Sequence, residues 1–376
     1  MNAAGQGFGR LRGMVRKEWL QILRDPSSIA IAFVLPVVLL FLFGYGVSLD
    51  AKDIRLGLVV EQRDQPSLQL AEAFRRSEYF IPRCFVDIRD AEAALTRHQL
   101  DGIVWLRHDF SRKLLSEPPA AIAVRVNGVN ANQGRITEGY IQGVWQSWLD
   151  KYARDRGREL QPPVQLQHRI WFNPAVISRH YLVPGLIAII MTLIGSLLTA
   201  MVVAREWERG TMEAIMATPL RIREMLAGKL IPYFVLGMAG MLFTVLLAHW
   251  LFAVPLRGSF GILLLAGALF MLVALAMGLL ISIVSKNQFV AGQLALIVTF
   301  LPAFILSGFI FDIGSMPAPV QLITHLVPAR YFVAILQTLF LAGDIWAVIL
   351  PNLGALALML LVLMAVIRRK AHKRLA

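Results

Sequence analysis

The chain has 376 residues, 57% of them hydrophobic, and a mean hydropathy of +0.62. Because soluble domains are only about 45–50% apolar, this composition excludes an ordinary soluble domain and indicates a membrane protein. The formal net charge of +13 does not indicate a nucleic-acid partner, because a basic groove needs Lys and Arg clustered with aromatic residues on one surface, whereas here the charges sort by membrane side.

Cysteine and histidine usage argues against a metal site or a disulfide framework. Cys84 is the only cysteine, so no intrachain disulfide and no cysteine-based metal or haem motif can form. The histidines show no metal-ligand spacing. We therefore expect no metal site, and we expect Cys84 to be a small buried apolar side chain.

Six apolar segments are long enough to cross a bilayer core of about 30 Å, which takes roughly 20 helical residues. They are predicted at residues 29–47, 182–203, 230–252, 260–284, 289–311 and 345–367. Basic residues gather in residues 1–28, in the connection between the second and third spans, and in the tail at 368–376. The positive-inside rule therefore predicts that both termini are cytoplasmic.

The long segment 48–180 separates the first span from the second, and six spans with both ends inside place it outside the membrane. Within it, β-branched apolar runs alternate with helical patterns, which favours an α/β domain whose sheet is covered by helices. The strands are predicted at 54–60, 80–87, 102–106 and 121–126, and the helices at 66–77, 90–99 and 132–152. No catalytic constellation is recognisable in this domain, and we expect no catalytic residue in the chain.

The six predicted spans contain no Asp, Glu, Lys or Arg, which are the residues that an ion-coupled transporter normally carries there. The chain also lacks the G-x-x-x-x-G-K-[ST] loop that binds nucleotide phosphates, so we expect no cofactor in this chain. Active transport would therefore draw its energy from a partner.

The segment 204–229 between the second and third spans has the local signals of a short helix. Gly210 permits a turn, the hydroxyl of Thr211 can cap a helix, and Glu213 in its first turn favours the helix dipole. Pro219 marks the end of this helix. The sequence thus predicts a helix of two turns rather than an irregular loop.

One face of this short helix is apolar. Met212, Ile215 and Met216 follow the i, i+3, i+4 spacing of a stripe that the rest of a short loop could not bury. Such a stripe fits a groove on another protein. The alternative is a helix on the lipid headgroups, with Arg205, Glu206, Glu208 and Arg209 as its solvated flanks.

A re-entrant hairpin is predicted between the fifth and sixth spans, at residues 312–342. Its apolar pieces, 317–327 and 329–341, are too short to span a bilayer and are separated by Pro328. We expect them to enter the outer leaflet and return. The fold class expected is therefore an α-helical polytopic membrane protein with an inserted α/β domain and this hairpin.

The segment from Ala204 resembles the permeases of type-2 ATP-binding-cassette (ABC) transporters, through A-R-E-x-E-x-G-T-x-E-x-x-x-x-T-P and a following E and G-K-x-x-P-Y. In that family it forms a coupling helix that enters a cleft on a nucleotide-binding subunit. The docking residues that the resemblance implies are Arg205, Glu206, Glu208, Gly210, Thr211, Met212, Glu213, Ile215, Met216, Thr218, Pro219, Glu224 and Lys229.

Two more segments resemble the family. Residues 17–26 look like its amphipathic elbow helix on the inner membrane face, and 306–317 with 328–333 look like its outer hairpin. Asp312 departs from the pattern, because the family often has proline there. The large domain after the first span is similar to the subgroup linked to bacterial multidrug efflux, which often works with a periplasmic adaptor and an outer-membrane duct.

The resemblance implies an inner-membrane assembly of two permease chains, identical or different, with ATPase subunits that bind ATP and Mg. Because the spans lack charges, a hydrophobic or amphiphilic cargo is expected. Export of a lipid, glycan or natural product remains open, as does an assembly that passes motion to envelope partners without transport. A passive receptor or channel would have no ATPase partner.

Overall fold

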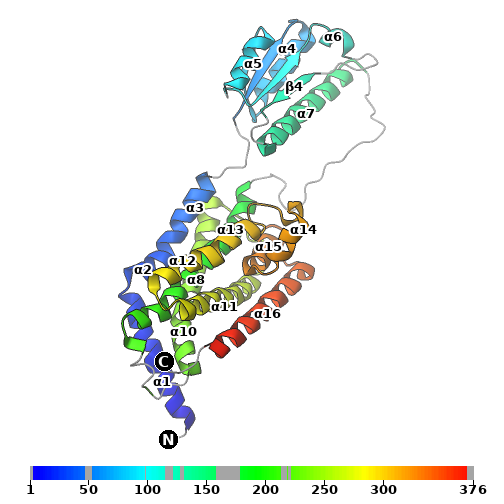
Figure 1. The fold of residues 1–376 in the computed structure, drawn as a ribbon. Coiled ribbons are helices and arrows are strands. Elements are labelled where there is room, and N and C mark those ends of the chain that lie inside the picture. The colour runs from blue at the N-terminus through cyan, green and yellow to red at the C-terminus, as the bar shows by residue number, and fades with distance from the viewer. Residues whose placement is uncertain are drawn as a thin grey trace. The chain divides into compact units, whose positions relative to one another are not determined.

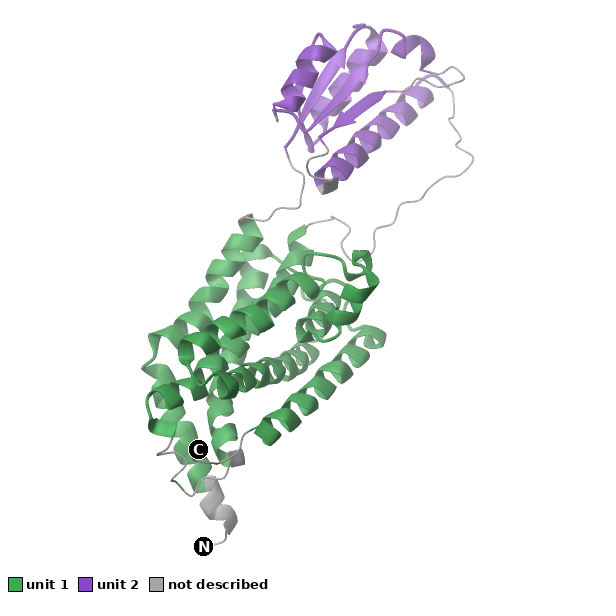
Figure 2. Cartoon of the chain, viewed as in Figure 1, with its two compact units in different colours: residues 1–48, 170–376 green, residues 49–169 purple. Residues whose placement is uncertain are grey.

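The computed structural model describes residues 3–46, 53–97, 99–114, 122–127, 131–157, 178–212, 218 and 222–370. The chain divides into two compact units (Figure 2). One is Leu49–Arg169, close to the predicted α/β domain at 48–180, and the other combines Met1–Ser48 with Ile170–Ala376. We call them the α/β unit and the helical unit.

Among the described residues, six helical segments are long and apolar enough to cross a membrane (Figure 1). This confirms the six predicted spans. They are Pro26–Tyr45, Ser178–Glu208 (α8), Glu224–Phe252 within α10 (Ile222–Phe252), Phe260–Ser285 (α11), Gln288–Leu306 and Trp346–Lys370 (α16).

The first and fifth spans each contain a π-helical turn. The first consists of α2 (Pro26–Ile29), η1 (Ala30–Val34) and α3 (Leu35–Gly46), and the fifth of α12 (Gln288–Ala295), η2 (Leu296–Phe300) and α13 (Leu301–Leu306). In both, a Leu-Pro pair follows the π turn directly. A proline ring clashes with the carbonyl four residues earlier, and a wider turn relieves that clash.

The fifth span ends earlier than predicted, at Leu306 rather than at residue 311. Gly308 has a φ of +84°, a left-handed conformation that suits glycine and turns the chain. The chain therefore turns at Gly308 and does not continue as a helix. Asp312 then precedes a 3-10 turn, η3 (Ile313–Ser315), and accepts a hydrogen bond from the Ser315 hydroxyl at 3.2 Å.

Two short helices follow, α14 (Ala318–Thr324) and α15 (Pro328–Leu341), and their axes are bent by 84°. The break falls at Pro328, as the sequence predicts. Arg330 fixes the bend, because its guanidinium donates to the Gln321 carbonyl at 3.2 Å and contacts the Thr324 hydroxyl. Arg330 therefore links α15 to α14.

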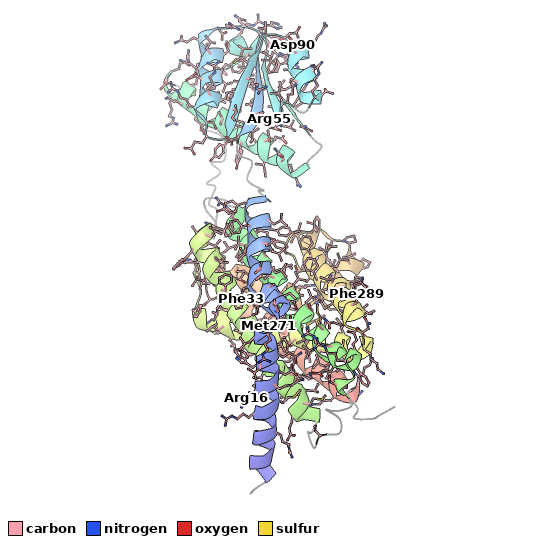
Figure 3. All side chains as sticks on the ribbon, turned by 90° about the vertical axis from the view of Figure 1, so that its left-hand side faces the viewer. Arg16, Phe33, Arg55, Asp90, Met271 and Phe289 are labelled. Carbon is pink, nitrogen blue, oxygen red and sulfur yellow. The ribbon has the colours of Figure 1, made fainter. Side chains whose placement is uncertain are left out.

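The core of the helical unit lies around α8, which is buried along most of its length and packs against α10, α11, α12 and α15. Glycines let α8 and α11 approach closely: a Cβ added at Gly195 would lie 2.5 Å from the Ala274 side chain. Met271 belongs to this core, whereas Arg16 on α1 (Ala3–Leu23) projects away from the helices (Figure 3).

The α/β unit has a four-stranded mixed sheet in the order β2-β1-β3-β4. β1 is parallel to both of its neighbours, and β3 and β4 are antiparallel. The strands are β1 (Ile54–Val60), β2 (Phe80–Phe85), β3 (Gly102–Leu106) and β4 (Ala123–Val126), and the helices are α4 (Gln65–Arg76), α5 (Ile88–Thr96), α6 (Phe110–Lys113) and α7 (Ala131–Arg154).

Helices cover both faces of this sheet, because alternate strand residues face opposite sides. Leu56 and Leu58 of β1 pack with α4 and α7, whereas Val59 packs with α5. Cys84 is exposed on the edge strand β2, so the expectation that it is buried is wrong. Its thiol instead accepts a hydrogen bond from Arg75 at 3.1 Å.

Candidate functional site

The site forms where α1 (Ala3–Leu23) packs against the first turns of α10. Leu11, Met14, Glu18 and Ile22 share one face of α1, and Met14, Glu18 and Ile22 are buried. Gly228 of α10 allows the close approach, because a Cβ there would lie 2.6 Å from the Met14 side chain. The packing of α1 against α10 brings Glu18 opposite Lys229, the residue that follows Gly228.

The buried ammonium of Lys229 is the centre of a group of four charges. It lies 3.0 Å from the Glu18 carboxylate and 3.3 Å from the Glu206 carboxylate of α8. Lys17, next to Glu18 on α1, contacts both carboxylates as well, at 3.2 Å from Glu18. We call Lys17, Glu18, Glu206 and Lys229 the four-charge cluster.

The cluster carries two positive and two negative charges. This balance allows Glu18, Glu206 and Lys229 to be buried, while the Lys17 side chain is 44% exposed. The side chains of Glu18 and Lys229 are each 1% exposed. Buried ion pairs of this kind depend on all their partners, because removing one leaves an uncompensated charge in a medium of low dielectric constant. Burial lowers the pKa of Lys17, but the hydrogen bond to Glu206 and the charges of Glu18 and Glu206 raise it above its ordinary value.

A second ion pair joins the start of the first span to the end of α8. Both terminal guanidinium nitrogens of Arg205 lie 3.0 Å from the Asp25 carboxylate. Asp25 also caps α2, since it accepts from the Ser27 amide at 3.1 Å and from the Ser28 hydroxyl at 3.0 Å. Burial alone would raise the pKa of Asp25, but the serine hydrogen bonds and Arg205 lower it to about 2.

Further contacts attach the same helices to their neighbours. Arg10 of α1 pairs with Glu224 of α10 at 3.0 Å. Glu208 at the end of α8 accepts from the Gln288 amide, the first residue of α12, at 3.0 Å. The segment that leaves α8 is therefore held at its base by ion pairs with α1, α10 and the capping residue of α2, and by a hydrogen bond from α12.

Comparison with known proteins gives the family. The sequence profile described as ABC-2 family transporter protein matches residues 26–368. The chain belongs to this family. It is 45% identical over 344 residues to the "Probable multidrug ABC transporter permease YbhS" of Escherichia coli (strain K12), covering 91% of each chain.

Two more distant relatives carry similar names. The chain is 28% identical to the "Probable multidrug ABC transporter permease YbhR" of Escherichia coli (strain K12), covering 89% of this chain and 90% of that one. It is 26% identical to the "Inner membrane transport permease YhhJ" of the same strain, over 78% and 79% of the two chains. The chain is thus a multi-pass ABC transporter permease.

The structure places the predicted site residues of this permease in different environments. Glu206, Glu224 and Lys229 have partners within the chain, as does Arg205 through Asp25. Glu208, Gly210 and Thr211 are exposed, and Gly210 takes the predicted turn with a φ of +67°. Thr218 is half-buried, and Glu213, Ile215, Met216 and Pro219 lie outside the described residues.

Met212 corrects the predicted apolar stripe. We expected the stripe to be exposed, because the rest of a short loop could not bury it, but Met212 is 6% exposed and packs with Val203, Leu226 and Ile367. Residues from α8, α10 and α16, far apart in the sequence, form this small core together. The Thr211 hydroxyl contacts the carboxylate of Glu206 in the helix before it.

Lys17 and Glu18 were not predicted as site residues, because residues 17–26 resemble a surface helix. A signal does exist in the sequence: Glu18 falls on the apolar face of α1 that Leu11, Met14 and Ile22 define. A carboxylate on such a face needs a cationic partner. Lys229 lies just before the predicted third span, and in the structure it is a buried residue of α10.

Proposed function

We propose that this permease is the membrane subunit of an ABC exporter in the bacterial inner membrane, and that a separate ATPase binds its segment 204–229. The four-charge cluster is the observation that carries the proposal. Through Glu206 and Lys229, 3.3 Å apart, it joins the two ends of the segment to each other and to α1. A force applied between those ends would thus move α1, α8 and α10 together.

The docking surface in this proposal consists of the segment's remaining residues. Glu208, Gly210 and Thr211 are exposed at its start, whereas Glu206, Met212 and Lys229 support it from inside. Ile215 and Met216 are the apolar residues that would enter the ATPase. ATP and Mg would bind in that partner, whose closure would push the segment and tilt the spans.

The rest of the assembly follows from the same proposal. Both termini are cytoplasmic, the α/β unit lies outside, and the α14–α15 hairpin enters the outer leaflet. A second permease chain completes the path through the lipid bilayer, and the α/β unit is the surface for a periplasmic adaptor and an outer-membrane duct. No nucleic acid takes part.

The cargo in this proposal is a hydrophobic or amphiphilic drug-like compound. The six predicted spans carry no acidic or basic residue, and two of the relatives are named multidrug permeases. Lipids, glycans and natural products are the second cargo class. An assembly that only transmits motion to the envelope would instead show ATP turnover without cargo movement.

Docking is tested by purifying the chain with the phosphate-loop ATPase that accompanies it. Ile215→Asp and Met216→Asp should abolish copurification, because a carboxylate in an apolar groove is costly. The matched control is Val86→Asp, which places the same charge at an apolar residue of the α/β unit that is 79% exposed. Undiminished ATPase recovery by both segment variants, with normal membrane insertion, would contradict the docking proposal.

A further inference from the structure

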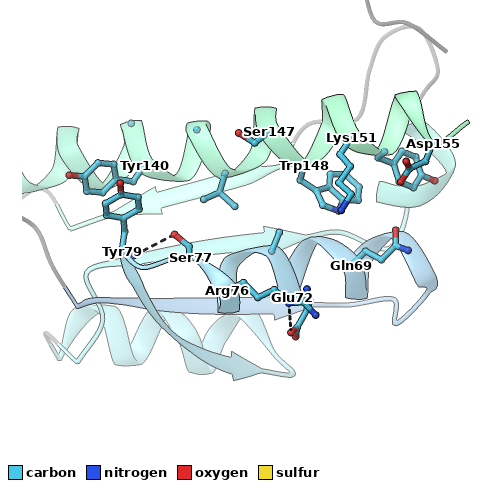
Figure 4. A pocket seen from close by; sticks show the side chains of 15 residues that line it. Gln69, Glu72, Arg76, Ser77, Tyr79, Tyr140, Ser147, Trp148, Lys151 and Asp155 are labelled. Atoms are coloured by element: carbon cyan, nitrogen blue, oxygen red, sulfur yellow. Dashed lines mark hydrogen bonds and ion pairs between the residues drawn. The ribbon is translucent and has the colours of Figure 1, made fainter. Parts of the chain in front are cut away.

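The α/β unit has a groove of about 720 Å³ between α4 and α7 (Figure 4). Pockets for small molecules have volumes of roughly 300–1,000 Å³ and combine aromatic surface with a few polar groups. The helical unit contains no residue of this groove, and neither the ionic contacts at segment 204–229 nor the transmembrane core uses it.

Two stacked aromatic pairs line the groove. The rings of Tyr79 and Tyr140 are 4.2 Å apart and inclined by 22°, and those of Trp148 and Tyr152 are 4.9 Å apart and inclined by 25°. Tyr79 is 44% exposed, so part of the first pair is open to a ligand. Flat rings in this arrangement favour a flat aromatic partner that extends the stack.

Between these aromatic pairs, α7 lines the groove with residues that have small side chains or none. Gly139, Gly143 and Ser147 follow one another at intervals of four residues and therefore share one face of the helix. A Cβ added at Gly139 or Gly143 would meet no atom within 4 Å, so packing inside the chain does not require either glycine. Glycine weakens a helix interior, and here it leaves space beside the aromatic rings.

The charged side chains that line the groove are two acidic and two basic residues, so they give it no net charge. Arg76 pairs with Glu72 at 3.2 Å, and Lys151 and Asp155 lie four residues apart at the other end of the groove. The Gln69 amide and the Ser147 hydroxyl lie on the facing helices (Figure 4). These neutral groups can bond to polar substituents on the edge of a flat ring system.

We infer that the α4–α7 groove binds planar polycyclic aromatic compounds with polar edges. The ligand's ring plane stacks on the Tyr79–Tyr140 pair and lies over the Gly143 backbone. This binding does not require the ATPase, so it is measured on the full chain alone in detergent or nanodiscs, where failure of the export proposal would not affect it.

The probe is proflavine, a planar cation, and saturable binding is followed by its fluorescence anisotropy. Gly143→Leu adds a side chain whose Cβ would meet no atom within 4 Å, and leucine favours the helix, so we expect a folded chain whose groove affinity falls at least about tenfold. The matched control is Gln142→Leu, which puts the same side chain on an exposed position that does not line the groove. We expect its affinity to change less than about twofold.

The aromatic contact and the shape of the ligand are tested separately. Tyr140→Ala should weaken binding about five- to tenfold, whereas Tyr140→Phe, which keeps the ring, should not. Tetraphenylphosphonium has the same charge but is not planar, and we expect it not to displace proflavine. Undiminished proflavine binding by Gly143→Leu, or equal displacement of proflavine by tetraphenylphosphonium, would overturn the inference. The absence of saturable proflavine binding would also overturn it, and is the result expected if the groove instead binds a helix of another protein.

Discussion

Lys229 is the residue whose loss should most destabilise the contacts between α1, α8 and α10. Its ammonium faces two carboxylates, those of Glu18 and Glu206, and is 1% exposed. We expect Lys229→Met to lower the free energy of unfolding by about 3–5 kcal/mol, because both carboxylates would lose a buried partner. Thermal unfolding in detergent measures the effect.

A second variant separates charge from packing at this position. Glu18→Gln added to Lys229→Met removes one of the uncompensated charges, so the double variant should be more stable than Lys229→Met alone. Equal unfolding temperatures for the unmodified chain and Lys229→Met would show that the cluster does not stabilise the helical unit.

Asp25 gives a pH dependence with a definite sign. Its pKa is lowered from 3.8 to about 2, so its stabilising contribution is complete above 3.8 and is lost as the pH falls through about 2. The difference in unfolding temperature between the unmodified chain and Asp25→Asn should therefore stay constant from about pH 7 to pH 5 and shrink below about pH 4. A difference that grows on acidification would contradict this assignment.

At the scale of elements, the contact between α1 and α10 depends on Gly228. A side chain there would displace Met14, whose nearest atom lies 2.6 Å from the position of a Cβ. Gly228→Leu should destabilise the helical unit by about 1–3 kcal/mol, as overpacking does. Thermal unfolding measures the loss, and Met14→Ala in the same chain should recover part of it.

The control for this prediction is another helical glycine. A Cβ at Gly354 of α16 would meet nothing within 4 Å, so Gly354→Leu should leave the unfolding temperature nearly unchanged. If Gly228→Leu were equally neutral, α1 would not pack against α10 in the way described.

Long elements were predictable from the sequence, whereas contacts between them were not. Apolar runs of about 20 residues predicted all six spans, and β-branched apolar runs predicted β1 to β4 within a few residues. The exposure of Met212 was mispredicted because its neighbours come from α8, α10 and α16. The end of the fifth span was mispredicted because the conformation of Gly308 outweighs the apolar residues after it.

The candidate site shows the same division. The pattern of segment 204–229 predicted its short helix and the family resemblance implied its site residues, but Lys17 and Glu18 lie 189 and 211 residues from the partners they meet. Only the packing of α1 and α8 against α10 brings them together. A charged residue on an apolar helix face was the one local signal for that packing.

At the scale of the molecule, the chain combines a helical unit of six spans with an inserted α/β unit, and it belongs to the ABC-2 transporter family. We propose above all that transport by this permease draws its energy from an ATPase bound at segment 204–229. The two units would then have separate roles, with energy entering through the helical unit and ligands or partners meeting the α/β unit.

The most direct test reconstitutes the permease and its ATPase in vesicles and follows ATP-dependent movement of a fluorescent amphiphile. The account predicts transport with the unmodified chain and with Val86→Asp, and none with Ile215→Asp or with an ATPase that cannot hydrolyse ATP. Transport that persists without the ATPase, or that Ile215→Asp leaves unchanged, would contradict it.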